Sequence, residues 1–389
     1  MADVGPGRPK DRPAAGWAPL VRLLAKTLLL LLVLNAAVLP FDSVAYAGRL
    51  SLYNSLVPGR LRLPYADDPA RAFNVSATQL DALFRSHVLS GAAVGADELR
   101  VVVLGDSSVW GFRLGPQETL AARLNHLGLR AGDRTLTFYN VGYPTMSLAK
   151  DLLLLRRALE YRPEVIVWLV TLESFPVELQ ADSPLVRFNR GEAQAALTQS
   201  GIDPFRYLSR EDETQWWTNT LAGRRRELAE LFRLQVFGLM WAATGIDYDA
   251  GAVFAARAED MEPDPTFHGQ SPGPWPESAL AWDLLEAGIR AAGDTPILIV
   301  NEPTFVSHGA NSDVRYSFLY PRWAFDSYRS EWAARCLTQG WTCIDLWDAL
   351  PGEAFTDSAV HYNPAGAETL AGLLADAILT MAARLEPVP

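Results

Sequence analysis

The chain has 389 residues, of which 49% are hydrophobic and 20% charged, a composition typical of globular proteins with a sizeable core. The formal net charge of −11 argues against a nucleic-acid partner, because binding to phosphate backbones needs clustered lysine and arginine. The length allows one large domain or two ordinary ones.

The N-terminal region resembles a membrane anchor. Residues 1–16 are rich in proline, glycine and basic side chains, and we expect a disordered cytoplasmic tail. Residues 17–41 follow as an apolar segment, of which residues 27–41 (TLLLLLVLNAAVLPF) carry no charge. Arg22 and Lys26 can extend their charged ends toward headgroups, so the segment reaches the roughly 20 residues that a transmembrane helix needs.

Charges around this segment predict its orientation. Basic residues precede it and acidic residues follow it, which by the positive-inside rule places the large domain outside the cytoplasm. Two alternatives remain open. One is a cleaved signal peptide with secretion of the rest, because Ala45-Tyr46-Ala47 before Gly48 has the form of a cleavage site. The other is a helix buried in the protein core.

The rest of the chain divides into a connector and a domain. Residues 42–96 are interrupted by prolines and are expected to form a connector with a short helix at 77–90. From residue 97 to 389, apolar runs alternate with amphipathic ones. Strands are predicted at 99–104, 136–141, 165–170, 296–300 and 342–346, and helices at 118–129, 147–161, 278–292, 323–339 and 364–385.

This alternation favours an α/β fold with parallel strands joined by helical crossovers. Residues 176–290 interrupt the pattern and are expected to form a mostly helical insertion, with a helix at 228–244 and a Pro-rich loop at 263–276. We therefore predict a three-layer, flavodoxin-like sandwich with a five-stranded parallel sheet. In such folds the chemistry lies at the carboxyl ends of the strands.

The two cysteines, Cys336 and Cys343, exclude a four-cysteine zinc site. A disulfide between them is compatible with an extracytoplasmic domain, and two buried thiols are the other interpretation. No motif for a metal or an organic cofactor is found, and none is expected.

Two blocks carry candidate catalytic residues. The first predicted strand leads into Gly105-Asp106-Ser107-Ser108, where a serine at a strand end can present its hydroxyl beside backbone N–H groups. Near the C-terminus, Asp357 and His361 precede the last predicted helix. A serine nucleophile needs a base, and the base needs a carboxylate that fixes its tautomer. Ser107, His361 and Asp357 fit these three roles.

With these blocks in place, the chain resembles the SGNH/GDSL hydrolase family over roughly residues 99–385, the insertion excepted. The family's GDS block places the nucleophile at Ser107, and its second block, a glycine after the second strand, matches Gly142. The resemblance implies that the backbone N–H groups of Ser107 and Gly142 form two arms of an oxyanion hole. It also implies hydrolysis of acyl esters through an acyl-serine intermediate, without a cofactor.

The chain departs from the family at the third block, where an asparagine normally completes the oxyanion hole. Here the residues after the third strand are Thr171-Leu172-Glu173-Ser174, and Glu173 takes the asparagine position. An ionised carboxylate there would oppose a developing oxyanion. Glu173 therefore points away or is protonated, or Thr171, Ser174 or Asn301 supplies the donor instead.

A second departure is the spacing of the acid. The family usually places the aspartate three residues before the histidine, whereas Asp357 lies four before His361. Offsets of three and four share one face of a helical turn, so Asp357 is still expected to reach the imidazole. Asp345 and Asp348 are the outside candidates.

Some of these residues have plainer interpretations. Ser107 can be a turn residue that caps the next helix, and His361 a histidine bonded to backbone. Residues 269–273 (GQSPG) match a nucleophile-elbow pattern around Ser271, but they lie in the Pro-rich loop with no preceding strand, which excludes that role.

The sequence thus predicts an extracytoplasmic serine esterase whose substrate is a small-molecule, lipid or carbohydrate ester, bound to the membrane through its N-terminal segment. One alternative is an O-acyltransferase acting on cell-surface polysaccharide, since the family contains such enzymes. Another is a non-catalytic domain of the same fold used for binding or assembly, which the missing third-block asparagine favours.

Overall fold

The protein was analysed as a computed structural model, which describes residues 17–41, 43–49, 52, 56, 59–65, 78–91, 95, 97–209, 219–244, 255–276 and 278–385. The predicted basic tail at residues 1–16 lies outside these ranges, as do parts of the connector and of the insertion.

The centre of the domain is a six-stranded sheet in the order β2-β3-β1-β4-β5-β6. The strands are β1 (Glu98–Leu104), β2 (Arg130–Ala131), β3 (Arg134–Asn140), β4 (Val165–Val170), β5 (Ile297–Asn301) and β6 (Thr342–Asp345). All neighbouring pairs except β2–β3 are parallel. The predicted α/β fold and five-stranded parallel sheet are therefore confirmed, and the order of the five parallel strands is flavodoxin-like.

The sixth strand, β2, corrects the predicted strand number. It pairs antiparallel with β3 through Arg130–Thr135 and Ala131–Arg134, around a two-residue turn that contains Gly132 at φ 54°. Turns of this length connect hairpin strands when glycine can take a positive φ. A strand of two residues is too short to show an alternating pattern, and for this reason β2 could not be predicted from the sequence.

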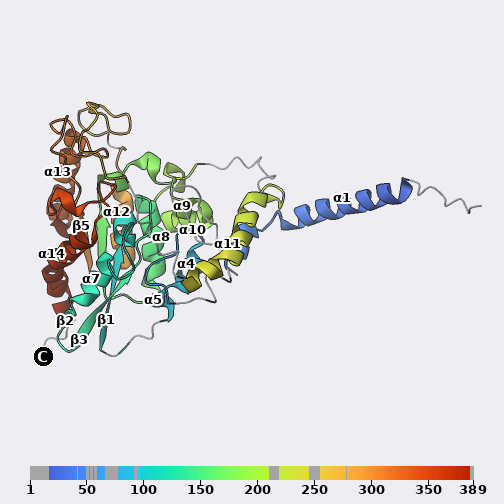
Figure 1. Ribbon diagram of the computed structural model, residues 1–389, viewed down its shortest axis with the longest axis horizontal. Coiled ribbons are helices and arrows are strands. Elements are labelled where there is room, and N and C mark those ends of the chain that lie inside the picture. The colour runs from blue at the N-terminus through green and yellow to red at the C-terminus, as the bar shows by residue number, and fades with distance from the viewer. Residues whose placement is uncertain are drawn as a thin grey trace, which may run out of the picture.

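Helices cover both faces of the sheet (Figure 1). The domain's helices are α6 (Ser107–Trp110), α7 (Leu120–His126), α8 (Leu148–Leu159), α9 (Pro184–Phe188), α10 (Arg190–Gln199), α11 (Arg225–Thr244), α12 (Trp282–Ala292), α13 (Arg322–Gln339) and α14 (Pro364–Ala383). Short 3₁₀ helices are η2 (Leu172–Ser174), η3 (Val177–Leu179), η4 (Pro204–Arg206) and η7 (Gly352–Ala354).

Alternate side chains of the central strands pack in two separate cores. Val102 and Leu104 of β1 join the core that includes α8, α12 and α13. Val101 and Val103 join the core of α7 and α14 on the opposite face. Because both faces are covered, β4 (VIVWLV) is buried along its whole length, which explains its uninterrupted apolar sequence.

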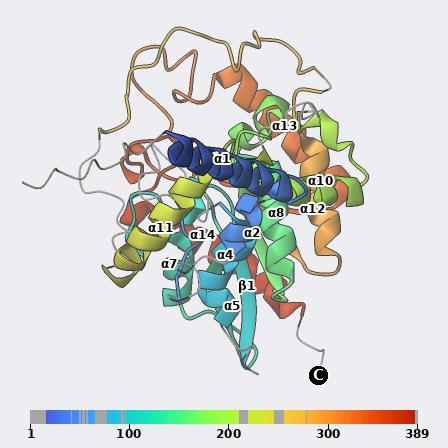
Figure 2. The same cartoon turned by 90° about the vertical axis from the view of Figure 1, so that its right-hand side faces the viewer.

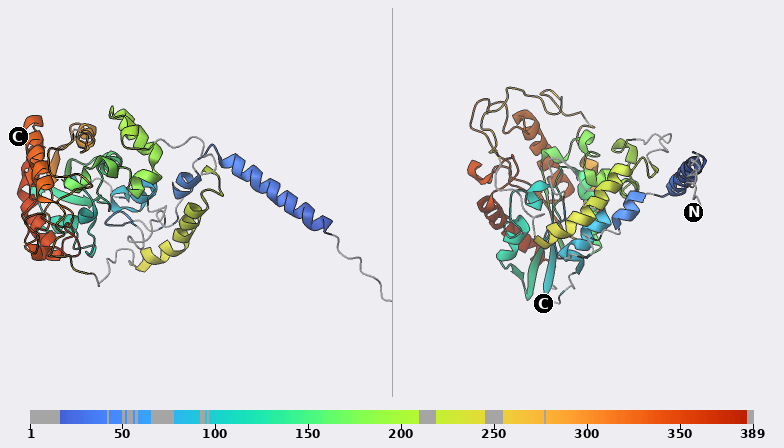
Figure 3. Two further views of the ribbon diagram at one scale, coloured as in Figure 1. Left: turned by 90° about the horizontal axis from the view of Figure 1, so that it is seen from above. Right: turned by 45° about the vertical axis from the view of Figure 1, so that its right-hand side comes forward.

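The N-terminal apolar segment forms α1 (Ala18–Val38), which projects away from the rest of the molecule (Figures 1 and 3). Its 21 residues span about 30 Å, the thickness of a bilayer's hydrocarbon core. None of its residues is buried, which excludes the interpretation as a core helix. Among the described residues α14 is also long and apolar enough to cross a membrane, but half of it is buried in the core.

Between α1 and β1, the described part of the connector contains α2 (Ser43–Arg49), α4 (Leu80–Ser86) and α5 (Val88–Gly91). Arg62 ties this segment to the domain, since its guanidinium donates to the carbonyl oxygens of Gly111 at 2.7 Å and Leu114 at 3.2 Å. The connector therefore packs against the residues that follow the nucleophile block.

Cys336 at the end of α13 and Cys343 on β6 form a disulfide, which decides between the two interpretations of the cysteines. Gly340, at φ 67°, ends α13 in the left-handed conformation and turns the chain into β6. The disulfide joins the helix to this last strand of the sheet.

Candidate active site

The nucleophile block follows β1 directly and opens a single helical turn, α6. The side chain of Asp106 caps this turn by accepting a hydrogen bond from the Ser108 amide at 2.8 Å. Asp106 therefore takes the capping role considered for Ser107, whose hydroxyl points instead to His361. Within the described part of the chain, the Ser107 amide donates to no other group.

The histidine block is a loop closed at its base. Phe355 and Tyr362 form an antiparallel bridge, and the Thr356 amide donates to the His361 carbonyl oxygen at 2.8 Å. Asp357 and His361 thus face each other across this loop, not along a helical turn as the spacing argument assumed. Asn363 then caps α14 by accepting from the Gly366 amide.

The loop brings three predicted residues into one hydrogen-bonded line. His361 Nε2 lies 2.9 Å from Ser107 Oγ, and His361 Nδ1 lies 2.9 Å from Asp357 Oδ1. The Phe112 ring packs against the imidazole with ring centres 4.7 Å apart. A neutral imidazole held in this way donates from Nδ1 to the carboxylate and accepts at Nε2 from the serine hydroxyl.

Asp357 has two further polar partners. Its Oδ2 lies 3.3 Å from Arg113 Nε, and its Oδ1 accepts from the Thr356 hydroxyl at 3.1 Å. Burial alone would raise the pKa of Asp357, but the hydrogen bond and the charge of His361 outweigh it and lower that pKa well below its ordinary value. The carboxylate is therefore charged at any pH at which the protein is expected to work.

Gly142, the second-block glycine, lies against α6. A Cβ at this position would be 2.4 Å from the Trp110 amide nitrogen, so only glycine allows the two loops to approach this closely. Its own amide donates to Asn140 Oδ1 at 3.0 Å. In this structure the Gly142 N–H is thus engaged, whereas the Ser107 N–H is not.

The three alternative third donors all have partners elsewhere. The Thr171 hydroxyl donates to Tyr320 Oη at 3.0 Å, and the Ser174 hydroxyl accepts from the Thr171 amide in a capping box. The Asn301 side-chain amide donates to Asp345 at 2.8 Å. All three side chains are buried.

Glu173 is held by His268, a histidine that no sequence motif singled out. Both of its carboxylate oxygens lie within 3.0 Å of His268 Nε2. The hydrogen bond that His268 donates to the Glu173 carboxylate outweighs burial and raises the pKa of His268, so the pair is an ion pair over a wider pH range than an isolated histidine would allow. His268 belongs to the Pro-rich loop at residues 263–276, in which Ser271 is exposed.

A buried carboxyl, Glu302, links the two candidate catalytic blocks. Its Oε2 accepts from the hydroxyl of Ser108 at 2.5 Å and from that of Tyr362 at 3.3 Å. Ser108 is next to Ser107 in the chain, and Tyr362 is next to His361. Burial, followed by the charge of Asp106, raises the pKa of Glu302 well above its ordinary value.

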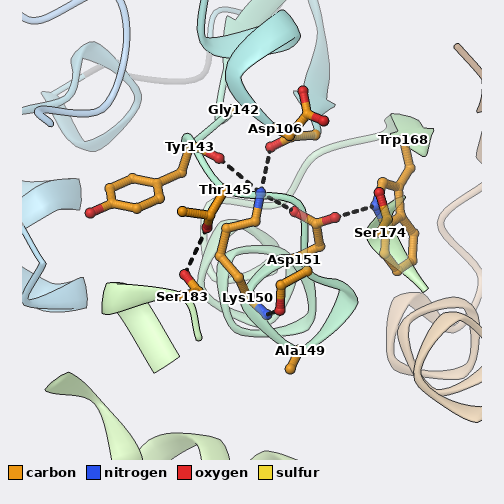
Figure 4. A network of polar contacts seen from close by, with 12 residues as sticks. Asp106, Gly142, Tyr143, Thr145, Ala149, Lys150, Asp151, Trp168, Ser174 and Ser183 are labelled. Atoms are coloured by element: carbon orange, nitrogen blue, oxygen red, sulfur yellow. Dashed lines mark hydrogen bonds and ion pairs between the residues drawn. The ribbon is translucent and has the colours of Figure 1, made fainter. Parts of the chain in front are cut away.

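A buried ammonium group joins the loops that carry Ser107 and Gly142 (Figure 4). Lys150 on α8 is fully buried, and its Nζ donates to the carbonyl oxygens of Gly105 and Tyr143, both at 2.9 Å. Asp151 Oδ1 lies 2.7 Å away and balances the charge, while Trp168 donates to the other Asp151 oxygen at 3.1 Å. The ammonium group therefore donates two hydrogen bonds to backbone carbonyl oxygens and forms an ion pair with Asp151.

Sequence reasoning missed Glu302 and Lys150. Glu302 does carry a signal, because it is a charged residue directly after the buried strand β5. Lys150 carries none, since it lies in the first turn of an ordinary amphipathic helix. Among the described residues, no group of three or more His, Cys, Asp or Glu side chains is placed to hold a metal ion.

Comparisons with known proteins concern the fold. No family model and no curated protein matches the chain. Among solved structures, the chain is similar to a carbohydrate acetylesterase family member from Sinorhizobium meliloti, at 12% identity over 73% of this chain and 98% of that one, with a TM-score of 0.33. An aryl esterase from M. smegmatis matches at 12% identity over 72% and 99%, with a TM-score of 0.32. A G-D-S-L family protein from Desulfitobacterium hafniense matches at 10% identity over 72% and 98%, with a TM-score of 0.30.

Proposed function

We propose that the chain is a serine hydrolase of the SGNH type, which cleaves acyl esters through an acyl-serine intermediate. The observation that carries this proposal is the line of contacts from Ser107 Oγ through His361 to Asp357, each 2.9 Å long. Nucleophile, base and orienting carboxylate arrive from two segments 254 residues apart and meet at the carboxyl end of β1.

The reaction follows from these contacts. His361 Nε2 takes the proton of Ser107 as Oγ bonds to the ester carbonyl carbon, and Asp357 stabilises the imidazolium that forms. His361 then returns the proton to the leaving alcohol as the ester C–O bond breaks. A water molecule attacks the acyl-serine by the same route, which releases the acid and restores Ser107.

The tetrahedral intermediate needs hydrogen-bond donors for its oxygen. The Ser107 N–H is available, and we assign it the first position. Gly142 supplies the second N–H after a small rotation that releases Asn140 Oδ1. Glu173 stays outside this hole because His268 holds it.

The rival interpretation as a non-catalytic binding domain rests on the missing asparagine. It would require a histidine out of reach of the serine and a glutamate in the pocket. The contacts of His361 and Glu173 support neither condition. Hydrolysis and acyl transfer differ only in whether water or another hydroxyl accepts the acyl group, and faster turnover on adding a sugar acceptor would identify transfer.

We further propose that the domain lies outside the cytoplasm, anchored by α1. An unburied apolar helix of bilayer length supports the anchor, and the disulfide supports an oxidising compartment. The same location is reached by secretion if the segment is cleaved, and N-terminal sequencing of the purified protein distinguishes the two.

The test is covalent labelling of the full chain, purified in detergent, with a fluorophosphonate probe. We expect the wild type and Ser271→Ala to be labelled and Ser107→Ala to be unlabelled, with ester turnover reduced by about 10³-fold or more. Absence of labelling in a folded wild-type protein would refute the proposal, as would equal labelling of Ser107→Ala.

A further inference from the structure

Helix α11 of the insertion exposes a stripe of large apolar side chains. Phe232, Val236 and Met240 are spaced by four residues and are 71%, 49% and 62% exposed. Residues at this spacing lie on one side of a helix. An exposed stripe of this size on a helix that also has a packed face indicates an interaction surface.

One face of α11 packs against other residues of the same chain. Leu231 is buried in a small cluster with Val44 of α2, and Leu228 packs against it. The stripe of Phe232, Val236 and Met240 is therefore an additional apolar face and not the core-facing one.

Arginines accompany the stripe. Arg225 and Arg226 are exposed at the start of α11, and the helix contains three arginines against two glutamates. The whole chain, in contrast, has a net charge of −11. Apolar side chains flanked by arginines are typical of helices that lie in the headgroup region of a bilayer.

The position of α11 relative to α1 indicates what this apolar face contacts. Asn35, in the last turns of α1, accepts a hydrogen bond at 3.0 Å from the Ala222 amide, just before α11 begins. Figures 1 and 2 show α11 beside α2, near the domain end of α1, and running across the direction of α1. If α1 crosses the bilayer, α11 starts at the level where the hydrocarbon core ends and extends along the membrane surface.

We propose that α11 is an interfacial helix whose stripe of Phe232, Val236 and Met240 lies in the outer leaflet of the bilayer, with its arginines at the lipid phosphates. The proposal rests on the membrane placement of α1 and is independent of ester hydrolysis. It gives the domain two contacts with the membrane and so fixes its orientation.

The test uses the full chain reconstituted in anionic phospholipid vesicles, with an environment-sensitive fluorophore at one introduced cysteine. The native cysteines do not react because they form a disulfide. The positions are Val236→Cys for the stripe, Leu30→Cys for the anchor, and Leu337→Cys as the matched control, 84% exposed on α13. Lipids that carry a nitroxide in the upper acyl chain quench any fluorophore within the leaflet.

We expect quenching at Leu30→Cys and Val236→Cys to exceed that at Leu337→Cys by about threefold or more. Quenching at Leu30→Cys with none above control at Val236→Cys would overturn the proposal and leave the anchor intact. Absence of quenching at Leu30→Cys and Val236→Cys would overturn both. A fluorophore at Val236→Cys that is shielded equally with and without nitroxide lipid would show that a second protein copy covers the stripe, which also overturns the proposal.

Discussion

The two sides of the candidate site differ in how their polar groups are used. On the nucleophile side, His361 contacts both Ser107 and Asp357. Their chain neighbours Ser108 and Tyr362 are both hydrogen-bonded to Glu302. On the third-block side, Thr171, Ser174 and Asn301 are bonded to groups away from the serine, and Glu173 is bonded to His268.

This difference separates activation of the serine from stabilisation of the oxyanion. In the proposed mechanism, the contacts needed for proton transfer are already made, whereas the only unengaged oxyanion donor identified among the described residues is the Ser107 amide. We infer that the nucleophile side sets the rate and that the third-block side has a structural role in this chain. The following predictions test that separation.

The largest effect is expected from Asp357→Asn. An asparagine favours the wrong histidine tautomer, so we expect turnover to fall by about 10⁴-fold with little change in folding. Steady-state kinetics on an activated ester measure the loss, and Asp345→Asn is the control, since Asp345 pairs with Arg329 and Asn301 instead. A greater loss in Asp345→Asn would show that the acid has been misassigned.

The next effect concerns Lys150, whose ammonium group is hydrogen-bonded to the loops that carry Ser107 and Gly142. Lys150→Met leaves Asp151 buried without its counter-charge, and we expect a loss of about 3–5 kcal/mol in the free energy of unfolding. Chemical denaturation measures it. The double variant Lys150→Met with Asp151→Leu should regain part of the loss, while Arg290→Met on the exposed side of α12 should change stability little. Equal losses in the single and double variants would contradict the ion-pair account.

Glu302 should make stability depend on pH. Its pKa is raised by burial, so the folded protein keeps this proton at pH values where an unfolded glutamate, with an ordinary pKa of about 4.3, has released it. Folded stability therefore falls as the pH rises above that value, by up to about 1.4 kcal/mol per pH unit. In Glu302→Gln, which cannot titrate, unfolding measured from pH 5 to 8 should show a smaller decline. The exposed Glu368→Gln should behave like the wild type, and parallel curves for all three would disprove the assignment.

The smallest effect is expected from Glu173→Gln. If Glu173 is outside the oxyanion hole, its neutralisation should change kcat/KM by less than about threefold and stability by less than about 1 kcal/mol. His268→Gln should give a similar result. A gain or loss of activity of two orders of magnitude in Glu173→Gln would place this carboxylate beside the reacting atoms. The inference that the third-block side has only a structural role would then be wrong.

The sequence was informative where local patterns determine structure. The apolar run of β4 predicted a strand of the sheet, because a strand buried on both faces has apolar residues throughout. The block Gly105-Asp106-Ser107 predicted that the candidate nucleophile lies at the end of the first strand, where the structure has it. Asp357 was predicted as the acid from helical spacing, whereas the structure brings it to His361 through the loop between Phe355 and Tyr362.

Contacts between distant segments could not be derived in this way. Ser108 and Glu302 are 194 residues apart, and Lys150 and Gly105 are 45 apart. Nothing in the local sequence distinguishes a buried lysine in a first helical turn from an exposed one, because the carbonyl oxygens that bind Lys150, those of Gly105 and Tyr143, lie outside its helix. The same holds for the Gly142 amide, since its acceptor is a side chain whose rotamer the sequence does not specify.

The ends of the sheet have a consequence for association between molecules. An exposed edge strand offers unpaired backbone groups to any other chain, and long flat edges promote aggregation. Here the two edge strands are β2, with two residues, and β6, with four. Cys343 on β6 is also bonded to α13, which limits how far this strand can detach. A crowded population of these molecules on a surface therefore has little opportunity to join sheet to sheet.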